Sequence, residues 1–394
     1  MRAMKDSGIE WIGEIPVGWE IRRLRFLCQI ITGDKDTINK KEDGLYPFYV
    51  RSPNIERIDS YTFDGEAILM AGDGVGAGKV FHYVNGKFDY HQRVYNLHFF
   101  KDISGKYLYY YLKENFWKKI EESNAKSTVD SVRLPMLLDF PVALGELPEQ
   151  TRIASFLDNK CTAIDASIEK QRASIDKLKE YRQVVITNAV TKGLNPDVPM
   201  KDSGVEWIGE IPEGWDVVKL KWLARMKSGE SITSNIIDND STYPVYGGNG
   251  LRGYAKSFTH NGSYILIGRQ GALCGNVHIV KGNFWASEHA IVTYELITLD
   301  QKWLFYILSA MNLNQYSTSA AQPGLAVEQI QRLSTLLPPI SEQHEIAAYL
   351  DQKCTAIDEA VSKKETLIKK LEEYKKSLIY EAVTGKIEIP ELSA

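Results

Sequence analysis

Cysteine is scarce in this chain of 394 residues, which contains only Cys28, Cys161, Cys274 and Cys354. No two of them form a CxxC pair, so the pattern argues against a cysteine-ligated zinc ion. Long hydrophobic runs are also missing: none approaches the ~18 residues that a membrane span requires. The first residues, MRAMKDSGIEW, lack the apolar region of a signal peptide. We therefore expect a cytoplasmic protein in a reducing compartment, with no membrane segment.

Motifs that carry catalysis are missing too. The glycine-rich stretch AGDGVGAGKV, residues 71–80, has Asp73 where a phosphate-binding P-loop needs glycine and Val80 where it needs serine or threonine. The pair Pro338-Pro339 lacks the polar and aromatic neighbours of an amino-methyltransferase motif, and the seven histidines show no zinc-ligand spacing. We expect no catalytic residue, no metal site and no cofactor in this chain.

Positive charge is not in excess. The formal net charge is −4, whereas autonomous DNA-binding domains are mostly basic, because neutralising phosphates supplies much of their affinity. If the chain binds DNA, its positive groups must gather on one face or another subunit must contribute them. The charge alone mildly favours an alternative, a coiled-coil scaffold that carries two protein-binding domains.

What the chain does have is two very long helical stretches. Residues 147–193 contain no proline after Pro148 and no glycine before Gly193, and residues 339–385 repeat the pattern. Apolar residues recur at spacings of three, four or seven and form a seam along each stretch. The first seam contains Ile153, Leu157, Ile164, Ile168, Ile175 and Leu178, and the second contains Ile346, Leu350, Ile357, Val361, Ile368 and Leu371. At about 1.5 Å per residue each helix is roughly 65 Å long, so we expect the two to pair as an antiparallel strut.

The helices belong to a larger internal repeat. MKDSGIEWIGEIPVGWEIRRLRFL, from Met4, returns from Met200 as MKDSGVEWIGEIPEGWDVVKLKWL, and both helices contain LDxKCTAID. We name these opening stretches, residues 4–27 and 200–223, the clasp segments, because their tryptophans and turn residues suit the docking of a domain onto a helix end. The cysteines in LDxKCTAID are expected to be packing residues rather than a redox pair.

The sequences between the repeated anchors diverge, and each predicts a small mixed domain. In residues 4–146, strands are expected at 46–50, 67–71, 79–84 and 94–100, followed by a helix at 106–121. Residues 200–338 repeat the plan with strands at 264–267, 276–280 and 290–294 and a helix near 301–311. The fold class is therefore α+β: two small α/β domains separated by two long antiparallel coiled-coil helices, with pseudo-two-fold symmetry. The end of the second helix should return to the first clasp segment.

This order of segments resembles the DNA-specificity (S) subunits of type I restriction-modification systems. The resemblance covers essentially the whole chain and rests on the duplication, on Leu147-Pro148-Glu149-Gln150 and Ile340-Ser341-Glu342-Gln343 at the helix starts, and on the repeated Gly18-Trp19 and Gly214-Trp215. It implies that each variable domain is a target-recognition domain that reads one half of a split double-stranded DNA site, while the helices fix the unread spacer.

The resemblance also implies partners. Two modification (methyltransferase) subunits would dock on the chain and methylate adenine with S-adenosylmethionine. Restriction (translocase/nuclease) subunits, where the system has them, would add ATP- and Mg-dependent translocation and cleavage. A stand-alone DNA methyltransferase or nuclease is a further alternative, but it needs a cofactor or metal constellation that the sequence does not show.

Polar residues near the glycine-rich turns are the candidates for DNA contact, because glycine permits close backbone approach and arginine, glutamine and asparagine suit base edges. The candidates are Arg51, Asn54, Lys79, His91, Gln92 and Arg93 in the first domain and Asn249, Arg252, Arg269, Gln270, Asn276 and His289 in the second. Arg269 has alternatives, since it could bind a phosphate or a carboxylate such as Glu288.

Overall fold

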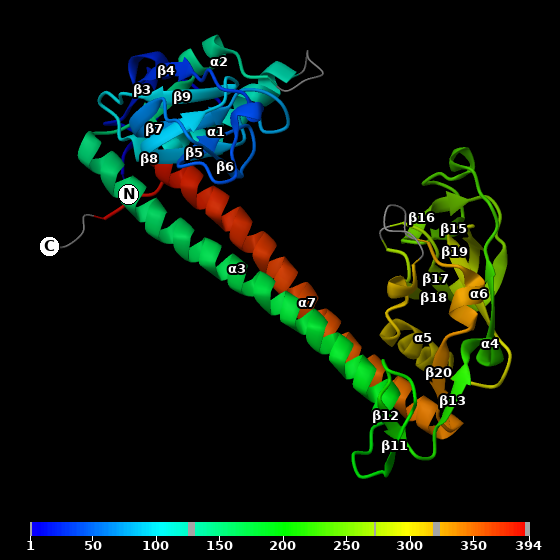
Figure 1. Cartoon of the computed structure of the whole chain (residues 1–394). Coiled ribbons are helices and arrows are strands. Elements are labelled where there is room, and N and C mark those ends of the chain that lie inside the picture. The colour runs from blue at the N-terminus through cyan, green and yellow to red at the C-terminus, as the bar shows by residue number, and fades with distance from the viewer. Residues whose placement is uncertain (1, 125–130, 272, 318–323, 391–394) are drawn as a thin grey trace. The chain divides into compact units, whose positions relative to one another are not determined.

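The chain forms two compact units in the computed structural model, which describes residues 2–124, 131–271, 273–317 and 324–390. Unit 1 comprises Met1–Gln171 together with Glu365–Ala394, and unit 2 comprises Arg172–Lys364. Helix α3 (Leu147–Lys192) begins in unit 1 and ends in unit 2, and helix α7 (Ile340–Val383) begins in unit 2 and ends in unit 1 (Figure 1). Each unit therefore contains one sheet domain and one part of each long helix.

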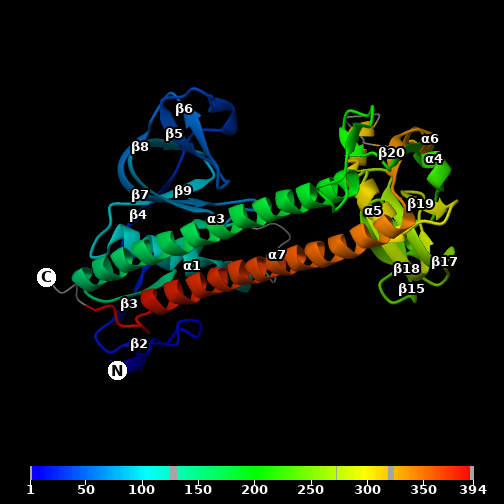
Figure 2. The ribbon, with the colours of Figure 1, turned by 90° about the horizontal axis from the view of Figure 1, so that it is seen from below.

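A six-stranded sheet forms the body of unit 1, in the order β4-β9-β7-β8-β5-β6. Its strands are β4 (Gln29–Thr32), β5 (Tyr46–Tyr49), β6 (Ile55–Ile58), β7 (Phe63–Ala71), β8 (Phe81–Tyr90) and β9 (Val94–His98). All neighbours are antiparallel except β5 and β8. Strands β8 and β9 run in the same direction, yet only residues 91–93 join them, so the sheet must curl strongly to bring the end of β8 to the start of β9 (Figure 2).

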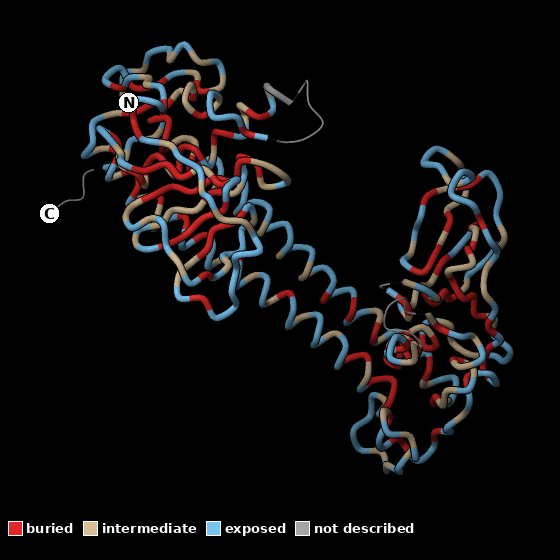
Figure 3. The backbone as a smooth tube through the Cα atoms, turned by 45° about the horizontal axis from the view of Figure 1, so that its top comes forward, coloured by how far each residue is buried: buried red, intermediate tan, exposed pale blue. Residues whose placement is uncertain are grey.

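Helix α1 (Gly105–Asn124) covers one face of this sheet. Its inner residues, Tyr111, Leu112 and Phe116 among them, are fully buried and belong to one core with Ile68 and Met70 of β7. Because the run 67–71 is buried on both faces, the centre of the sheet is continuously hydrophobic rather than alternating. Figure 3 shows buried backbone gathered in the interior of the sheet domains. Shorter elements complete the unit: β1 (Met4–Asp6), β2 (Glu14–Pro16), β3 (Glu20–Arg23), η1 (Leu24–Phe26), η2 (Thr37–Asn39), α2 (Leu134–Leu138) and β10 (Pro141–Leu144).

Unit 2 repeats this architecture strand for strand, with the sheet order β14-β19-β17-β18-β15-β16. The strands are β14 (Ala224–Ser228), β15 (Tyr243–Gly247), β16 (Gly250–Ala255), β17 (His260–Gly268), β18 (Val277–Ala286) and β19 (Ala290–Glu295), with α5 (Gln301–Ala310) in the place of α1. The remaining elements are β11 (Met200–Asp202), β12 (Glu210–Pro212), β13 (Asp216–Lys219), α4 (Leu220–Leu223), η3 (Ser234–Ile236), η4 (Leu313–Tyr316), α6 (Val327–Gln331) and β20 (Ser334–Leu337). The α+β class and the tandem repeat are thus confirmed.

The clasp segments dock each domain onto the start of its helix. In unit 1 the Nε1 of buried Trp19 donates to Glu149 Oε2 at 2.8 Å, and in unit 2 Trp215 Nε1 donates to Glu342 Oε2 at 2.9 Å. The buried amides of Gln150 and Gln343 add further hydrogen bonds to the preceding loops, three from Gln150 and two from Gln343. The Glu-Gln pair at both helix starts is therefore structural.

The end of α7 returns to the first clasp segment inside unit 1, as predicted. Tyr380 Oη lies 2.9 Å from the carbonyl oxygen of Trp11 and 3.1 Å from that of Ile12. Tyr107 Oη on α1 lies 2.7 Å from Val383 O. The same core therefore contains residues from both ends of the chain.

Within each unit the two long helices pack antiparallel through equivalent contacts. In unit 1, Lys375 on α7 donates to Asp165 on α3 at 2.6 Å, and in unit 2, Arg182 on α3 lies 3.2 Å from Asp358 on α7. The seam residues Ile153, Leu157, Ile164, Ile168, Ile175, Ile346, Leu350 and Ile357 are buried, whereas Leu178, Val361, Ile368 and Leu371 are half-buried. Burial is thus deepest towards the two ends of the pair, where each helix also meets a sheet domain. Cys161 and Cys354 are free, buried thiols among these contacts.

Candidate nucleic-acid interface

Three loops meet at the carboxyl ends of β5, β7 and β8 in unit 1, and we name them the first loop cluster (residues 50–54, 72–80 and 91–93). Gly72 N donates to Arg93 O at 2.8 Å, and His91 N donates to Tyr49 O at 2.9 Å. A side chain at Gly76 would collide with the carbonyl oxygen of Arg51. The glycines of the 71–80 stretch therefore allow loops to approach each other, which is a structural reason for the pattern that excluded a phosphate loop.

The side chains of the first loop cluster converge on Asp73. Arg51 Nη1 lies 3.0 Å from Asp73 Oδ1, and Arg93 Nε lies 3.7 Å from Asp73 Oδ2. The arginine side chains are 45% and 65% exposed and the carboxylate 28%, so the positive groups lie outside the acid. Two predicted DNA-contact residues from different loops are thus brought together by a residue that the prediction did not include.

A second acid supports the turn after β8. Gln92 Nε2 donates to Asp36 Oδ2 at 2.8 Å, and Gln92 itself is exposed. His91 differs from its prediction as a DNA-contact candidate, because its side chain is only 3% exposed and its Nδ1 accepts from Arg93 N at 2.9 Å. Burial, followed by the positive charge of Arg51, lowers the pKa of His91. We therefore assign this ring to support of the turn rather than to a base edge.

The remaining candidates of the first domain lie at the rim of the cluster. Lys79 is exposed near the end of the glycine-rich turn, and Asn54 is exposed in the loop after β5, where its carbonyl accepts from Ser52 Oγ at 3.2 Å. Val75, at the tip of the same turn, is 94% exposed. This turn therefore presents both apolar and polar groups to solvent.

Unit 2 has the corresponding second loop cluster (residues 248–249, 269–271, 273–276 and 287–289) at the carboxyl ends of β15, β17 and β18. Arg269 N donates to His289 O at 2.8 Å, which matches the bond between Gly72 and Arg93 in unit 1. A Cβ at Gly248 would lie 2.8 Å from Gln270 O and 3.0 Å from His289 O. The backbone of both clusters is held together in the same way.

The side chains of the second loop cluster form a different set. His289 Nδ1 lies 2.7 Å from Gln270 Oε1, and His289 Nε2 lies 3.2 Å from Glu288 Oε1. Glu288 Oε2 also accepts from Ile232 N at 3.2 Å. The carboxylate of Glu288 thus contacts His289 and Ile232, and base, phosphate and carboxylate stay open as ligands of Arg269.

The other candidates of the second domain surround this set. Arg269 is half-buried, and its carbonyl accepts from Leu325 N at 2.9 Å. Asn249, Arg252 and Asn276 are exposed, the first two in the hairpin of β15 and β16 and the third just before β18. The structure thus brings Arg269, Gln270, Asn249 and His289 into one region, and Arg252 borders it through Gly247, where a Cβ would meet the arginine stem.

Equivalent backbone positions in the two clusters carry unlike chemistry. Asp73 corresponds to Gln270, because each forms an isolated bridge to the segment that precedes α2 or α6. Arg93 corresponds to His289 through the shared carbonyl bond. One scaffold therefore presents an acid with two arginines in unit 1 and an amide with an imidazole in unit 2.

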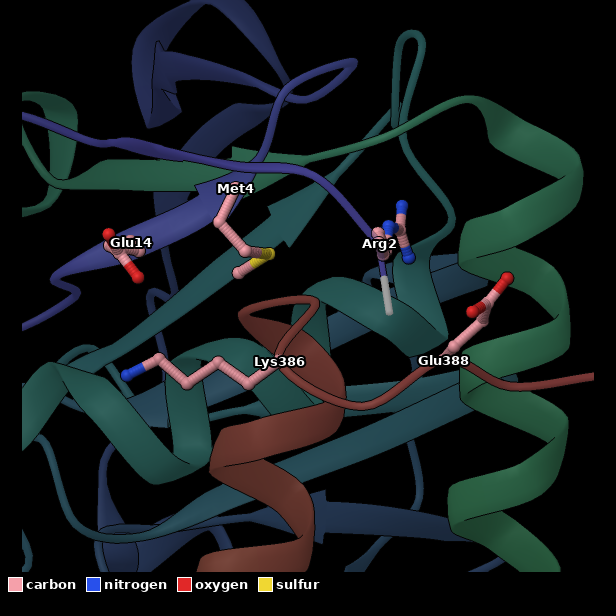
Figure 4. Close-up of a pocket in the computed structure, with 5 residues that line it drawn as sticks. All are labelled: Arg2, Met4, Glu14, Lys386 and Glu388. Carbon is pink, nitrogen blue, oxygen red and sulfur yellow. The ribbon is translucent and has the colours of Figure 1, made fainter.

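Two cavities lie away from these clusters, one in each unit. One of ≈ 490 Å³ lies between the first clasp segment and the end of α7 and is lined by Arg2, Met4, Glu14, Lys386 and Glu388 (Figure 4). A cavity of ≈ 400 Å³ in unit 2 is lined in part by Met200 and Glu210, the repeat equivalents of Met4 and Glu14. Among residues 2–124, 131–271, 273–317 and 324–390, no group of three or more acidic, histidine or cysteine side chains could hold a metal ion, and no helix there is long and apolar enough to cross a membrane.

Known proteins resemble the chain along most of its length. The sequence profile described as the type I restriction modification DNA specificity domain matches twice, at residues 16–177 and 212–373. The EcoprrI specificity subunit of Escherichia coli is 48% identical over 134 residues, 33% of each chain, and the EcoDI specificity subunit of Escherichia coli is 24% identical over 95% of this chain and 90% of its own. A chain from a solved structure of a type I R-M system has the same fold, with a TM-score of 0.71 at 14% identity over 95% of this chain and 99% of that one.

Proposed function

The chain belongs to the type I restriction modification DNA specificity family, and from that premise we propose that its two loop clusters read the two halves of a bipartite DNA site. It is a specificity subunit, and the chemistry resides in other subunits. The observation that carries the proposal is the pair of loop clusters: one backbone arrangement, occurring twice, with different side chains at equivalent positions. Sequence-specific readers need this combination, because the backbone sets the approach and the side chains choose the base.

The two long helices would set the spacer between the half-sites. Each helix is continuous from one unit into the other, with 46 residues in α3 and 44 in α7. A continuous helix transmits a fixed rise of about 1.5 Å per residue. The seam contacts and the equivalent ion pairs Lys375–Asp165 and Arg182–Asp358 support a fixed register.

Two modification subunits would dock on the chain, and repeat-equivalent exposed side chains support two copies of one partner. Phe26 and Trp222 are 65% and 64% exposed at the same place in the two clasp segments, and Tyr181 and Tyr374 are 54% and 55% exposed on the two helices. Large exposed apolar groups are typical of protein interfaces. These subunits would bring S-adenosylmethionine and much of the positive charge that a chain of net charge −4 lacks. Restriction subunits, where present, would use ATP and Mg.

A gel-shift experiment tests the proposal directly. The chain mixed with its modification subunits should retard a set of genomic fragments, and methylation mapped across the host genome should show a split motif that disappears when the gene is deleted. If neither subunit mixture nor chain binds DNA, and the genome's methylation is unchanged by deletion, the scaffold alternative replaces the proposal.

A further inference from the structure

We propose that Asp73 is a positioning residue that holds Arg51 and Arg93 as a pair of guanine readers for one half of the DNA site. The inference rests on the proposed function and assigns roles within the first loop cluster. It starts from the convergence of two arginines, 42 residues apart in the sequence (93 − 51), on the two oxygens of one carboxylate.

The backbone at Asp73 is held in place by contacts with other segments of unit 1. This residue forms an isolated bridge with Ser131, and the adjoining Gly72 donates to Arg93 O and accepts from Val132 N, each at 2.8 Å. The backbone that bears the carboxylate is therefore anchored to a second segment of the unit. An arginine loses side-chain entropy when it is ordered against DNA, and an ion pair made in advance reduces that loss.

The contacts leave the arginines able to read a base. Each ion pair engages one guanidinium nitrogen, Arg51 Nη1 and Arg93 Nε, whereas a guanidinium has five N–H donors in a planar fork. That fork matches the O6 and N7 acceptors of guanine in the major groove. Both arginines are more exposed than Asp73, so each can keep its bond to the acid while its outer edge faces a ligand.

The negative charge of Asp73 also favours a base over a phosphate as the ligand of Arg51 and Arg93. An acid 3.0 Å from Arg51 would repel a phosphate and cancel part of the attraction of the arginines. The same acid is compatible with a G·C pair, because a carboxylate accepts a hydrogen bond from the N4 amino group of cytosine. The neighbouring His91 adds no competing charge, since burial and Arg51 lower its pKa.

Unit 2 provides the contrast. At the corresponding positions it has Gln270 in place of Asp73 and His289 in place of Arg93, and these two bond to each other at 2.7 Å. The paired-arginine arrangement is therefore a feature of the first loop cluster. A requirement for guanine at particular positions of one half-site should trace to Arg51 and Arg93 and be independent of the second loop cluster.

The experiment uses the full chain assembled with its modification subunits and measures methylation of a DNA library randomised in both half-sites, at several salt concentrations. Arg51→Lys and Arg93→Lys keep the charge and lose the fork, so each should reduce the preference for guanine at one position by about tenfold, with the salt dependence unchanged. Asp73→Asn should relax the same positions, also without a change in salt dependence. Asp102→Asn is the matched control, because it removes a carboxylate 3.2 Å from Arg22, outside the loop cluster, and should leave the profile as in the wild type.

Other outcomes separate the possible failures. Uniform weakening at all sequences with a flatter salt dependence would assign the arginines to phosphates and overturn the inference. A lower melting temperature of Asp73→Asn with an unchanged profile would make Asp73 a tie between loops and overturn it as well. If the wild-type complex itself methylates without sequence preference, the proposed function fails and not only this inference.

Discussion

The burial of Glu114 on α1 makes the stability of the folded protein depend on pH near neutrality. Burial raises its pKa to about 7, although Lys376, Lys118 and Lys113 act in the opposite direction. The folded protein therefore retains a proton between about pH 4.5 and pH 7 that an unfolded chain releases, so the free energy of unfolding falls as the pH rises through this window and stays low above it. A glutamine at this position cannot ionise, so the Glu114→Gln variant does not lose stability as the pH rises.

We expect Glu114→Gln to be more stable than the wild type at pH 8, by about 1–2 kcal/mol, and no more stable at pH 5. Thermal unfolding at the two pH values measures this. Glu121→Gln, at an exposed position of the same helix, is the control and should change the melting temperature little at either pH. Equal effects of Glu114→Gln at both pH values would contradict the assigned origin of the stability change.

Arg269 in the second loop cluster could read a base or bind a phosphate, and the two roles predict different effects of its substitution on methylation. Arg269→Ala should relax the preference at one position of one half-site by about 1–3 kcal/mol if the side chain reads a base. It should instead weaken methylation of all sites uniformly and flatten the salt dependence if the side chain binds a phosphate. A library randomised in that half-site distinguishes the two, and a profile identical to the wild type in preference and strength would remove Arg269 from the interface.

The sequence could not reveal the roles of single residues in the clusters, because these depend on contacts between distant loops. Asp73 is not among the predicted contact residues, because its role depends on the positions of Arg51 and Arg93 in the folded chain. His91 was predicted as a contact from its place in a polar turn, and its 3% exposure follows from the packing around it. Glycine was the useful signal, since it marked where backbones approach closely.

At the scale of elements, the long helices and the central strands of the sheets could be predicted from the sequence, but the strands at the sheet edges could not. Residues 147–193 and 339–385 lack internal breakers, and they form α3 and α7 almost to the residue. The buried runs 67–71 and 264–267 lie in β7 and β17. Edge strand β16 (GLRGYA) escaped prediction because its glycines and partial exposure resemble a loop, and β4 (QIIT) because most of its residues are exposed.

The continuity of the long helices gives a prediction about spacing. Leu178 and Leu371 are repeat equivalents, and proline at either position removes a helical hydrogen bond and clashes with the preceding turn, at a cost of about 3 kcal/mol or more. We expect either variant to lose methylation at the original split site while both sheet domains remain folded. Methylation mapping combined with circular dichroism tests this, and an unchanged methylation pattern would refute the strut role of the helices.

The exposed aromatic residues of the clasp segments give a prediction about partners. The double variant Phe26→Ser, Trp222→Ser should lose affinity for the modification subunits by about tenfold or more, because exposed aromatics at such interfaces often contribute 2 kcal/mol or more. Val75→Ser, at a position that is 94% exposed in the first loop cluster, is the control and should leave assembly intact. Sedimentation or mass photometry of the complex measures both, and full assembly of the double variant would place the docking surface elsewhere.

At the scale of the whole molecule, the closure of the chain was predictable from the repeat alone. Because α3 leads directly into the second clasp segment, the equivalent end of α7 was expected at the first, and Tyr380 makes that contact with Trp11 and Ile12. Closure means that unit 1 depends on both ends of the chain, since residues 365–383 complete the core that Ile153 and Leu157 begin. The half-site sequences could not be predicted, because base choice depends on how the loop side chains meet the groove.

The modular arrangement predicts the result of exchanging one domain. Replacement of residues 26–144 by the matching piece of a homologue removes the first loop cluster and retains Trp19, α3 and α7, so one half of the DNA target should change while the other half and the spacer length stay the same. The donor must supply a hydroxyl at position 107, because Tyr107 Oη lies 2.7 Å from Val383 O on the retained helix. The reciprocal exchange of residues 222–337 is the matched control and should change only the opposite half. Methylome sequencing of both chimaeras tests the idea, and a single exchange that altered both half-sites would show that the two units do not read DNA independently.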